Sequence, residues 1–167
     1  MFCNKRMRMR TFTGLLNWPV QLLAIIFLGL TGCETINIYE HHVPIQNQTW
    51  SRGNVCAGSF QVSDTLKPHQ LYVVVRHTDA YAFSNIWLEV SLKAPGDSFK
   101  TQRVNVTLGN DYQGWLGTGM DDIWEVRSLL TGTPKPFNRA GMYEFRIRQI
   151  MREDPLKHIM SAGLRVE

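Results

Sequence analysis

The sequence of 167 residues contains few of the motifs that carry a known chemistry. No G-x-S-x-G segment marks a hydrolase nucleophile, and the aspartates are not spaced as in an EF-hand calcium loop. Gly114, Gly117 and Gly119 neither follow a predicted strand nor open a predicted helix, which argues against a phosphate-binding loop. The most apolar run, residues 20–30, is about eleven residues long, whereas a helix needs about 20 to span a bilayer.

What is present at the start of the chain is the layout of a bacterial lipoprotein signal. The apolar run is followed by the small residues Thr31 and Gly32 and then by Cys33. Four basic residues precede the run, and residues 1–32 contain no acidic one: Lys5, Arg6, Arg8 and Arg10. This order predicts that residues 1–32 are cleaved off and that the Cys33 thiol takes a covalent lipid, which would anchor the protein without spanning the membrane.

The charge of the predicted mature protein differs from that of the whole chain. The sequence has 18 basic and 14 acidic residues, and losing the four basic residues of the signal leaves 14 of each. The basic isoelectric point therefore belongs to the signal, and it gives no argument for nucleic-acid binding.

The predicted mature protein has only two cysteines, Cys33 and Cys56. Cys3 is lost with the signal and an acylated Cys33 cannot pair, so Cys56 has no partner for an intramolecular disulfide. A lone cysteine is more often a small buried apolar residue than a nucleophile, and we expect the former for Cys56.

From Cys56 onward apolar residues recur with period two, which is typical of half-buried strands. Turn signals separate about eight such runs, so we predict an all-β, jelly-roll-like β-sandwich over residues 51–167. Residues 33–50 are predicted to be a lipidated tether that leads into an edge strand, because Pro44 is excluded from a central strand. One short helix is expected near the C-terminus, with Asp154 as its cap, Pro155 in its first turn and Gly163 beyond its end. Residues 123–130 fit both a strand and a helix, and we predict a strand.

Three segments also resemble a known family: VRHTDAYAFSNIWLEV, GWLGTGMDDIW and GMYEFRIRQIMREDPLKHIMSAGLRVE. In this order, behind a lipoprotein signal, they are similar to the gliding motility lipoprotein GldH family of Bacteroidota. The resemblance covers about residues 50 to 167. It implies a lipoprotein needed for gliding in some members, with links to the type IX secretion machinery, and it carries over no catalytic or ligand-binding residue.

Several residue groups are candidate sites. The acidic residues Asp111, Asp121 and Asp122 are weak calcium candidates in a glycine-rich segment, with a plain hairpin turn as the alternative. In the same segment Tyr112 and Trp115, together with Tyr81 and Phe83, are candidates for stacking on a sugar. Alternatively, Trp115 packs over neighbouring glycine backbone and closes the sandwich.

Two further groups contain charged or catalytic residue types. Arg146 and Arg148 share a strand face with Glu144, and they form either a solvated surface or a partner-docking surface. His77 and Asp79 suggest general-base chemistry, but Arg76 and Thr78 lie on the strand face opposite His77 and no nucleophile motif accompanies them. His41 and His42 are adjacent and point to opposite faces of an extended chain, so they are not expected to share a metal.

These observations favour a non-enzymatic lipoprotein anchored at the outer membrane and facing the periplasm. It would act as an accessory or assembly component that docks other proteins of the gliding and secretion machinery. No cofactor is expected beyond the lipid on Cys33, and nucleic acid is not expected as a partner. The alternative is a glycan- or peptidoglycan-binding module, and an enzyme has the weakest support.

Overall fold

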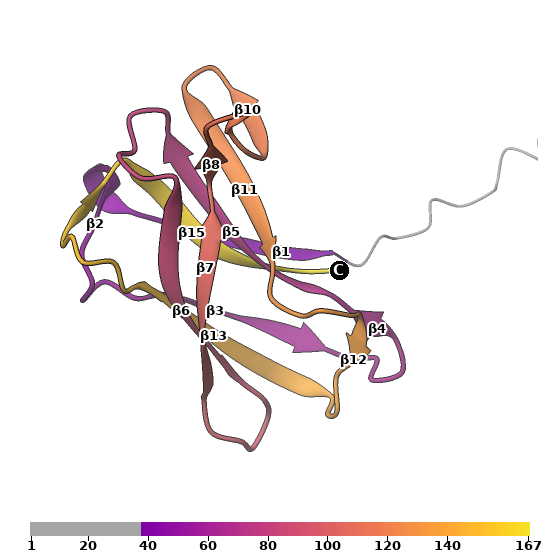
Figure 1. The fold of residues 1–167 in the computed structure, drawn as a ribbon. Helices are drawn as coiled ribbons and strands as arrows, with labels where there is room; N and C mark the ends of the chain where they lie inside the picture. The colour runs from indigo at the N-terminus through magenta and orange to yellow at the C-terminus, as the bar shows by residue number, and fades with distance from the viewer. Residues whose placement is uncertain (1–37) are drawn as a thin grey trace, which may run out of the picture. The chain divides into compact units, whose positions relative to one another are not determined.

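The computed structural model describes residues 38–167, so the predicted signal peptide and Cys33 lie outside the described residues. Within the described part, no helix has the length and hydrophobicity required to cross a membrane. Residues 38–167 form two antiparallel sheets that face each other across a hydrophobic core (Figure 1).

The first sheet has five strands in the order β1-β15-β5-β11-β10. Their bounds are β1 Tyr39–Pro44, β15 Ile159–Val166, β5 Leu71–Thr78, β11 Ile123–Leu129 and β10 Thr118–Met120. The second sheet has four strands in the order β3-β13-β6-β7, with bounds Cys56–Val62, Gly141–Gln149, Asn85–Lys93 and Lys100–Thr107. Residues 123–129 are thus a strand, as predicted.

Three short strand pairs and one 3-10 turn complete the described chain. The pairs are β2 (Thr49–Trp50) with β14 (Leu156–Lys157), β4 (Pro68–His69) with β12 (Lys135–Pro136), and β8 (Gly109–Asn110) with β9 (Gly114–Trp115). The turn η1 covers Gln46–Gln48.

The strand order is that of a jelly roll. Eight of the described strands have six or more residues, which matches the expected number: β1, β3, β5, β6, β7, β11, β13 and β15. Along the chain these strands alternate between the two sheets, and β6 and β7 are the one consecutive pair that stays in the same sheet. This double-sheet arrangement confirms the predicted all-β jelly-roll-like sandwich.

Period-two patterning decides which side chains enter the core. In β13 the apolar residues Tyr143, Phe145 and Ile147 are buried, whereas the intervening Arg146 and Arg148 are exposed. The same alternation in β6 buries Ile86, Leu88 and Val90. Because successive strand residues point to opposite faces, the charged half of each strand forms the outer face of its sheet.

The prediction of a short helix near the C-terminus is wrong. Residues that were expected to carry it form β14 and β15, and the described part has no α-helix there. Ile159, Ala162, Leu164 and Val166 are buried between the sheets, and β15 pairs with both β1 and β5. Pairing on both sides outweighs the local capping signal, because a central strand satisfies all its backbone groups and buries its apolar residues.

The sandwich also takes in residues that were assigned to the tether. β1 is the edge strand expected from Pro44, yet it pairs with β15 along its whole length, and Trp50 is fully buried. The sheet therefore begins at Tyr39, upstream of residue 51. Close pairing here depends on Gly163, where a Cβ atom would lie 2.1 Å from the His41 carbonyl oxygen.

Candidate functional site

The candidate site is the outer face of the four-stranded sheet, here called the cationic face. It is formed by the outward residues Lys93, Arg103, Arg146 and Arg148 together with Glu89 and Glu144. The register places Arg146 beside Ser91 and Arg148 beside Glu89 on β6. Glu89 in turn lies opposite Arg103 on β7. Strand pairing thus brings together charges from three strands.

A depression lies at the centre of the cationic face. It has a volume of about 280 Å³ and is lined by Val55, Glu89, Ser91, Phe99, Thr101, Arg146 and Arg148. The Arg146 guanidinium lies over the Phe99 ring, 4.1 Å from its centroid, which is cation–π geometry. The two arginines predicted as a docking surface therefore lie in one shallow hollow with an aromatic base.

Positive charge is in excess on this face. Arg148 pairs with Glu89 at 2.5 Å and Lys93 pairs with Glu144 at 2.8 Å. The hydrogen bond and charge of Lys93 lower the pKa of Glu144, so this carboxyl stays ionised. Within residues 38–167, Arg103 and Arg146 have no carboxylate at ion-pair distance. Two guanidinium groups are thus available for an external anion.

The outer face of the five-stranded sheet holds a different charge cluster, here called the balanced network. Its members are three acidic and three basic residues joined by ion pairs: Glu40, Glu125, Glu167, Arg76, Arg127 and Arg165. Burial alone would raise the pKa of Glu40, but hydrogen bonds from Arg165 and His42 and the charge of Arg127 lower it to about 2. No local pattern in the sequence predicts this network, because its members are far apart in the chain.

Potential metal ligands lie close together within the balanced network, but not at the three aspartates that were the calcium candidates. Within the described residues, one group of three potential ligand atoms lies within 4.8 Å: Glu40, His42 and Glu125. Arg127 already pairs with both of these carboxylates, so a protein cation stands where a metal would bind. The exposed Asp111, Asp121 and Asp122 are not brought together in such a group. His42 pairs with Glu40 whereas His41 lies against Phe145, so the two histidines do point to opposite faces.

The aromatic residues predicted as a sugar-stacking surface do not lie together on the surface. Tyr112 is 99% exposed at a turn, whereas Trp115 packs edge-on against His77 with centroids 4.6 Å apart. Tyr81 is buried and also packs against His77, with ring centroids 5.8 Å apart, and Phe83 packs against Tyr81. These rings do not form one exposed platform, and Trp115 instead closes the core over Gly109.

His77 lacks the surroundings of a catalytic base. The side chain is fully buried, and burial lowers the pKa of its imidazole, although a hydrogen bond to the Thr78 carbonyl opposes this. Its Nε2 atom has no hydrogen-bond partner within the described chain. A neutral imidazole that packs against Trp115 and Tyr81 acts as a core residue.

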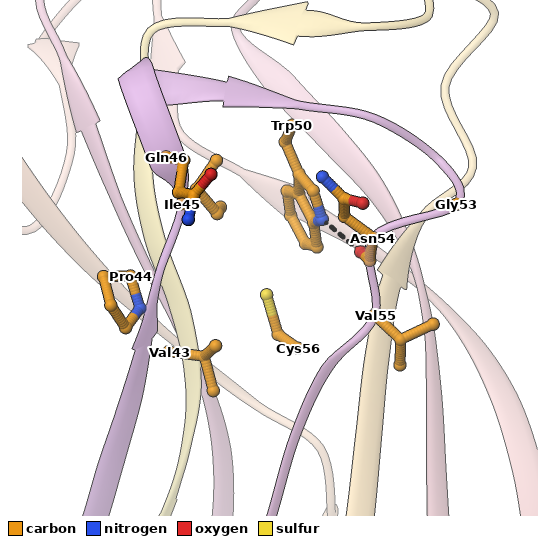
Figure 2. Close-up of a pocket in the computed structure, with 9 residues that line it drawn as sticks. All are labelled: Val43, Pro44, Ile45, Gln46, Trp50, Gly53, Asn54, Val55 and Cys56. Carbon is orange, nitrogen blue, oxygen red and sulfur yellow. Dashed lines mark hydrogen bonds between the residues drawn. The ribbon is translucent and has the colours of Figure 1, made fainter.

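Cys56 lies at a second pocket, which has a volume of about 430 Å³ (Figure 2). The close-up shows its sulfur pointing toward the space between Ile45 and Trp50, and the Trp50 indole N–H donates to the Asn54 carbonyl. Burial raises the pKa of the Cys56 thiol to about 11, although a backbone hydrogen bond partly opposes the shift. The thiol is therefore protonated at neutral pH and is not an activated nucleophile.

The family model described as GldH lipoprotein matches residues 37–166. The gliding motility lipoprotein GldH of Flavobacterium johnsoniae is 25% identical over 158 residues, covering 90% of this chain and 96% of that protein. A GldH homolog from Christiangramia forsetii is 23% identical over 157 residues, covering 90% and 95%.

Among solved structures, the infectious bursal disease virus VP2 subviral particle matches with 14% identity and a TM-score of 0.32. The match covers 78% of this chain and 32% of that one, and a similarity at this level carries no functional argument. The family match extends over the whole described sandwich and includes the cationic face. The chain belongs to the GldH lipoprotein family.

Proposed function

We propose that this protein is a lipid-anchored accessory component of gliding motility and of the associated type IX secretion machinery. Its lipid, palmitate or a related acyl group, would be carried on Cys33 and hold the sandwich at the periplasmic side of the outer membrane. The role would be non-enzymatic: the protein docks a partner through the cationic face. The names of the two curated relatives support the motility role.

The observation that carries the docking proposal is the pair of guanidinium groups, Arg103 and Arg146, that lack an acidic partner within the described chain. Arginine is enriched at protein interfaces, where it binds carboxylates with its planar, multidentate guanidinium group. Phe99 beneath Arg146 adds an apolar contact area at the centre of the depression. The expected partner is therefore a protein with an acidic surface patch.

Charge reversal on this face tests docking. We expect Arg146→Glu combined with Arg103→Glu to abolish co-purification of the partner and colony spreading, while the protein level stays unchanged. Lys157→Glu is the matched control, because Lys157 is exposed on β14 and outside the cationic face. A double variant that spreads normally and retains its co-purifying proteins would refute docking through this face.

The lipid anchor is tested separately. Cys33→Ser should leave an uncleaved precursor that takes up no labelled palmitate, because the acceptor thiol is gone. Processing and labelling at the normal level would contradict the anchor. Protease protection in intact cells, lost after the outer membrane is opened, would support the periplasmic orientation.

A further inference from the structure

One end of the sandwich, here called the β4–β12 end, combines exposed apolar and basic side chains. It consists of Ile38, the turn 63–67, and the short ribbon of β4 and β12. Ile38 lines the same pocket of about 380 Å³ as Lys67, His69 and Phe137. In Figure 1 the start of β1, the C-terminus and the β4–β12 ribbon lie on the same side of the sandwich.

The tip of this end is an apolar side chain held away from the core. Leu66 is 89% exposed, and its backbone N–H donates to the Asp64 carboxylate at 2.8 Å. This hydrogen bond has the pattern of an Asx turn, in which an aspartate side chain bonds the backbone two residues on. Ile38 adds a second exposed apolar residue, and Pro68 and Pro136 are also exposed.

Basic residues flank that apolar tip. Lys67 precedes β4 and Lys135 begins β12, and both side chains are exposed. In the described part of the chain neither has a carboxylate at ion-pair distance. The nearby acidic Glu167 is paired with Arg165, and Asp64 is engaged in the turn. Exposed leucine flanked by unpaired lysines suits the interface of a bilayer with anionic headgroups.

Chain length places this end next to the predicted anchor. Ile38 is the fifth residue after Cys33, and each residue spans at most about 3.6 Å, so the lipidated residue lies within about 18 Å of Ile38. We propose that the β4–β12 end rests on the phospholipid surface that holds the anchor, with Leu66 inserted at the headgroup level and Lys67 and Lys135 on anionic lipid phosphates. This inference rests on the lipid anchor of the proposed function.

The contact fixes the orientation of the molecule. The β8 and β10 segments lie at the other end of the sandwich from the β4–β12 ribbon in Figure 1. Tyr112 and Met120, both strongly exposed, are carried by that opposite end. In this orientation the β4–β12 end contacts the membrane and the end with β8 and β10 lies away from it. The cationic face is then at the side of the molecule, where a partner can reach it.

Depth-dependent fluorescence quenching tests the orientation in the full lipidated protein. A nitrobenzoxadiazole label on Leu66→Cys, in vesicles of phosphatidylethanolamine and phosphatidylglycerol, should shift to the blue and be quenched several-fold by spin-labelled lipid. The same label on Tyr112→Cys is the matched control and should remain unquenched. Cys56 is buried and Cys33 would be acylated, so labelling is confined to the introduced thiol. Equal quenching at both positions, or none at residue 66, would overturn the inference.

Failure of the anchor is distinguishable from failure of this orientation. A protein that takes up no palmitate and does not float with vesicles contradicts the proposed function, whereas an anchored protein with an unquenched label at residue 66 contradicts the orientation alone. Lys67→Glu combined with Lys135→Glu should reduce the quenching several-fold, as should omission of phosphatidylglycerol, and Lys157→Glu should not. Quenching unchanged in both cases would overturn the assignment of anionic headgroups as the ligand.

Discussion

The outer faces of the two sheets both carry the polar residues of alternating strands, but one face is balanced in charge and the other is cationic. On the five-stranded sheet, three carboxylates and three guanidinium groups are joined by ion pairs in the balanced network. On the four-stranded sheet, four basic residues face two acidic ones, and Arg103 and Arg146 have no such partner in the described chain. Both faces are built from the polar half of alternating strands, so alternation alone does not distinguish them.

The charges of the balanced network pair with one another and so contribute to stability. The unpaired charges of the cationic face are available to bind a partner. In the balanced network Glu40 and Arg165 are largely covered, and Glu40 joins the edge strand β1 to β15 and β11. On the cationic face the three arginines are exposed, and an exposed ion pair contributes little to stability. We therefore expect mutations on the first face to affect stability and those on the second to affect binding.

The largest expected effect comes from detaching β1, which removes Glu40 from its face. In Gly163→Ala the added Cβ would lie 2.1 Å from the His41 carbonyl oxygen, so β1 must move. We expect the free energy of unfolding to fall by about 3 kcal/mol, because a clash with backbone is not relieved by a rotamer change. Urea unfolding measures the loss, and hydrogen exchange should show lost amide protection in residues 39–44.

Gly132→Ala is the matched control for that substitution. A Cβ atom there meets nothing within 4 Å, so the stability should stay within about 0.5 kcal/mol of the wild type. Equal stability of both alanine variants would show that β1 tolerates displacement from the sheet.

Removing one charge from the balanced network comes next. Glu40→Gln should cost about 2 kcal/mol at neutral pH, because Arg165, which is 17% exposed, loses one of its two carboxylate partners and keeps only Glu167. The pKa of Glu40 is lowered to about 2, so the contribution is present above the ordinary carboxyl pKa of 4.5 and is lost as pH falls toward 2. Unfolding curves at several pH values should therefore converge in strong acid. Glu153→Gln, at an exposed carboxyl, should show no such difference.

Mild acid should lower the stability of the fold through the buried His77 rather than through the charges on either outer face. The pKa of His77 is lowered by burial, so the unfolded chain binds a proton at this residue before the folded chain does. The wild-type free energy of unfolding should consequently fall as pH drops below about 6.5, by about 1 kcal/mol near pH 5. His77→Leu should lack this part of the decrease. A pH dependence identical to that of the wild type would contradict a neutral, buried His77.

The smallest effect on stability is expected on the cationic face. Arg146→Ala removes the guanidinium group from the Phe99 ring and should cost less than about 1 kcal/mol, because the contact is partly exposed. The same variant should nevertheless weaken partner binding, measured by pull-down from membranes. A stability loss as large as that of Glu40→Gln would remove the distinction between the two faces.

The strands were predictable because their signal is local. Alternation in β6 and β13, and the continuous apolar run in β5 that buries Val73, Val74 and Val75, correctly marked half-buried and fully buried strands. The prediction of a helix after Asp154 was wrong because Asp154, Pro155 and Gly163 are also compatible with a turn followed by a strand. Here β14 pairs with β2, and β15 is held between β1 and β5.

Some groupings of surface residues can be predicted from sequence and others cannot, depending on whether the residues share a strand. Arg146 and Arg148 were found because they share one face of one strand. The balanced network escaped notice because Glu40, Glu125 and Arg165 come from three strands whose pairing is not encoded locally. Trp115 could not be distinguished from a ligand platform by sequence, since its contact with His77 depends on how β8 and β9 cover the core.

By itself, the sequence determined which side chains of each strand face inward and which face outward, because the backbone of an extended chain forces successive side chains to opposite sides. It also determined the all-β class through the spacing of its turns. Only the tertiary structure decided which outward charges neutralise one another, because cross-strand neighbours depend on strand order and register. That pairing closed the network around Glu40 and left Arg103 and Arg146 on the cationic face without acidic partners in the described chain.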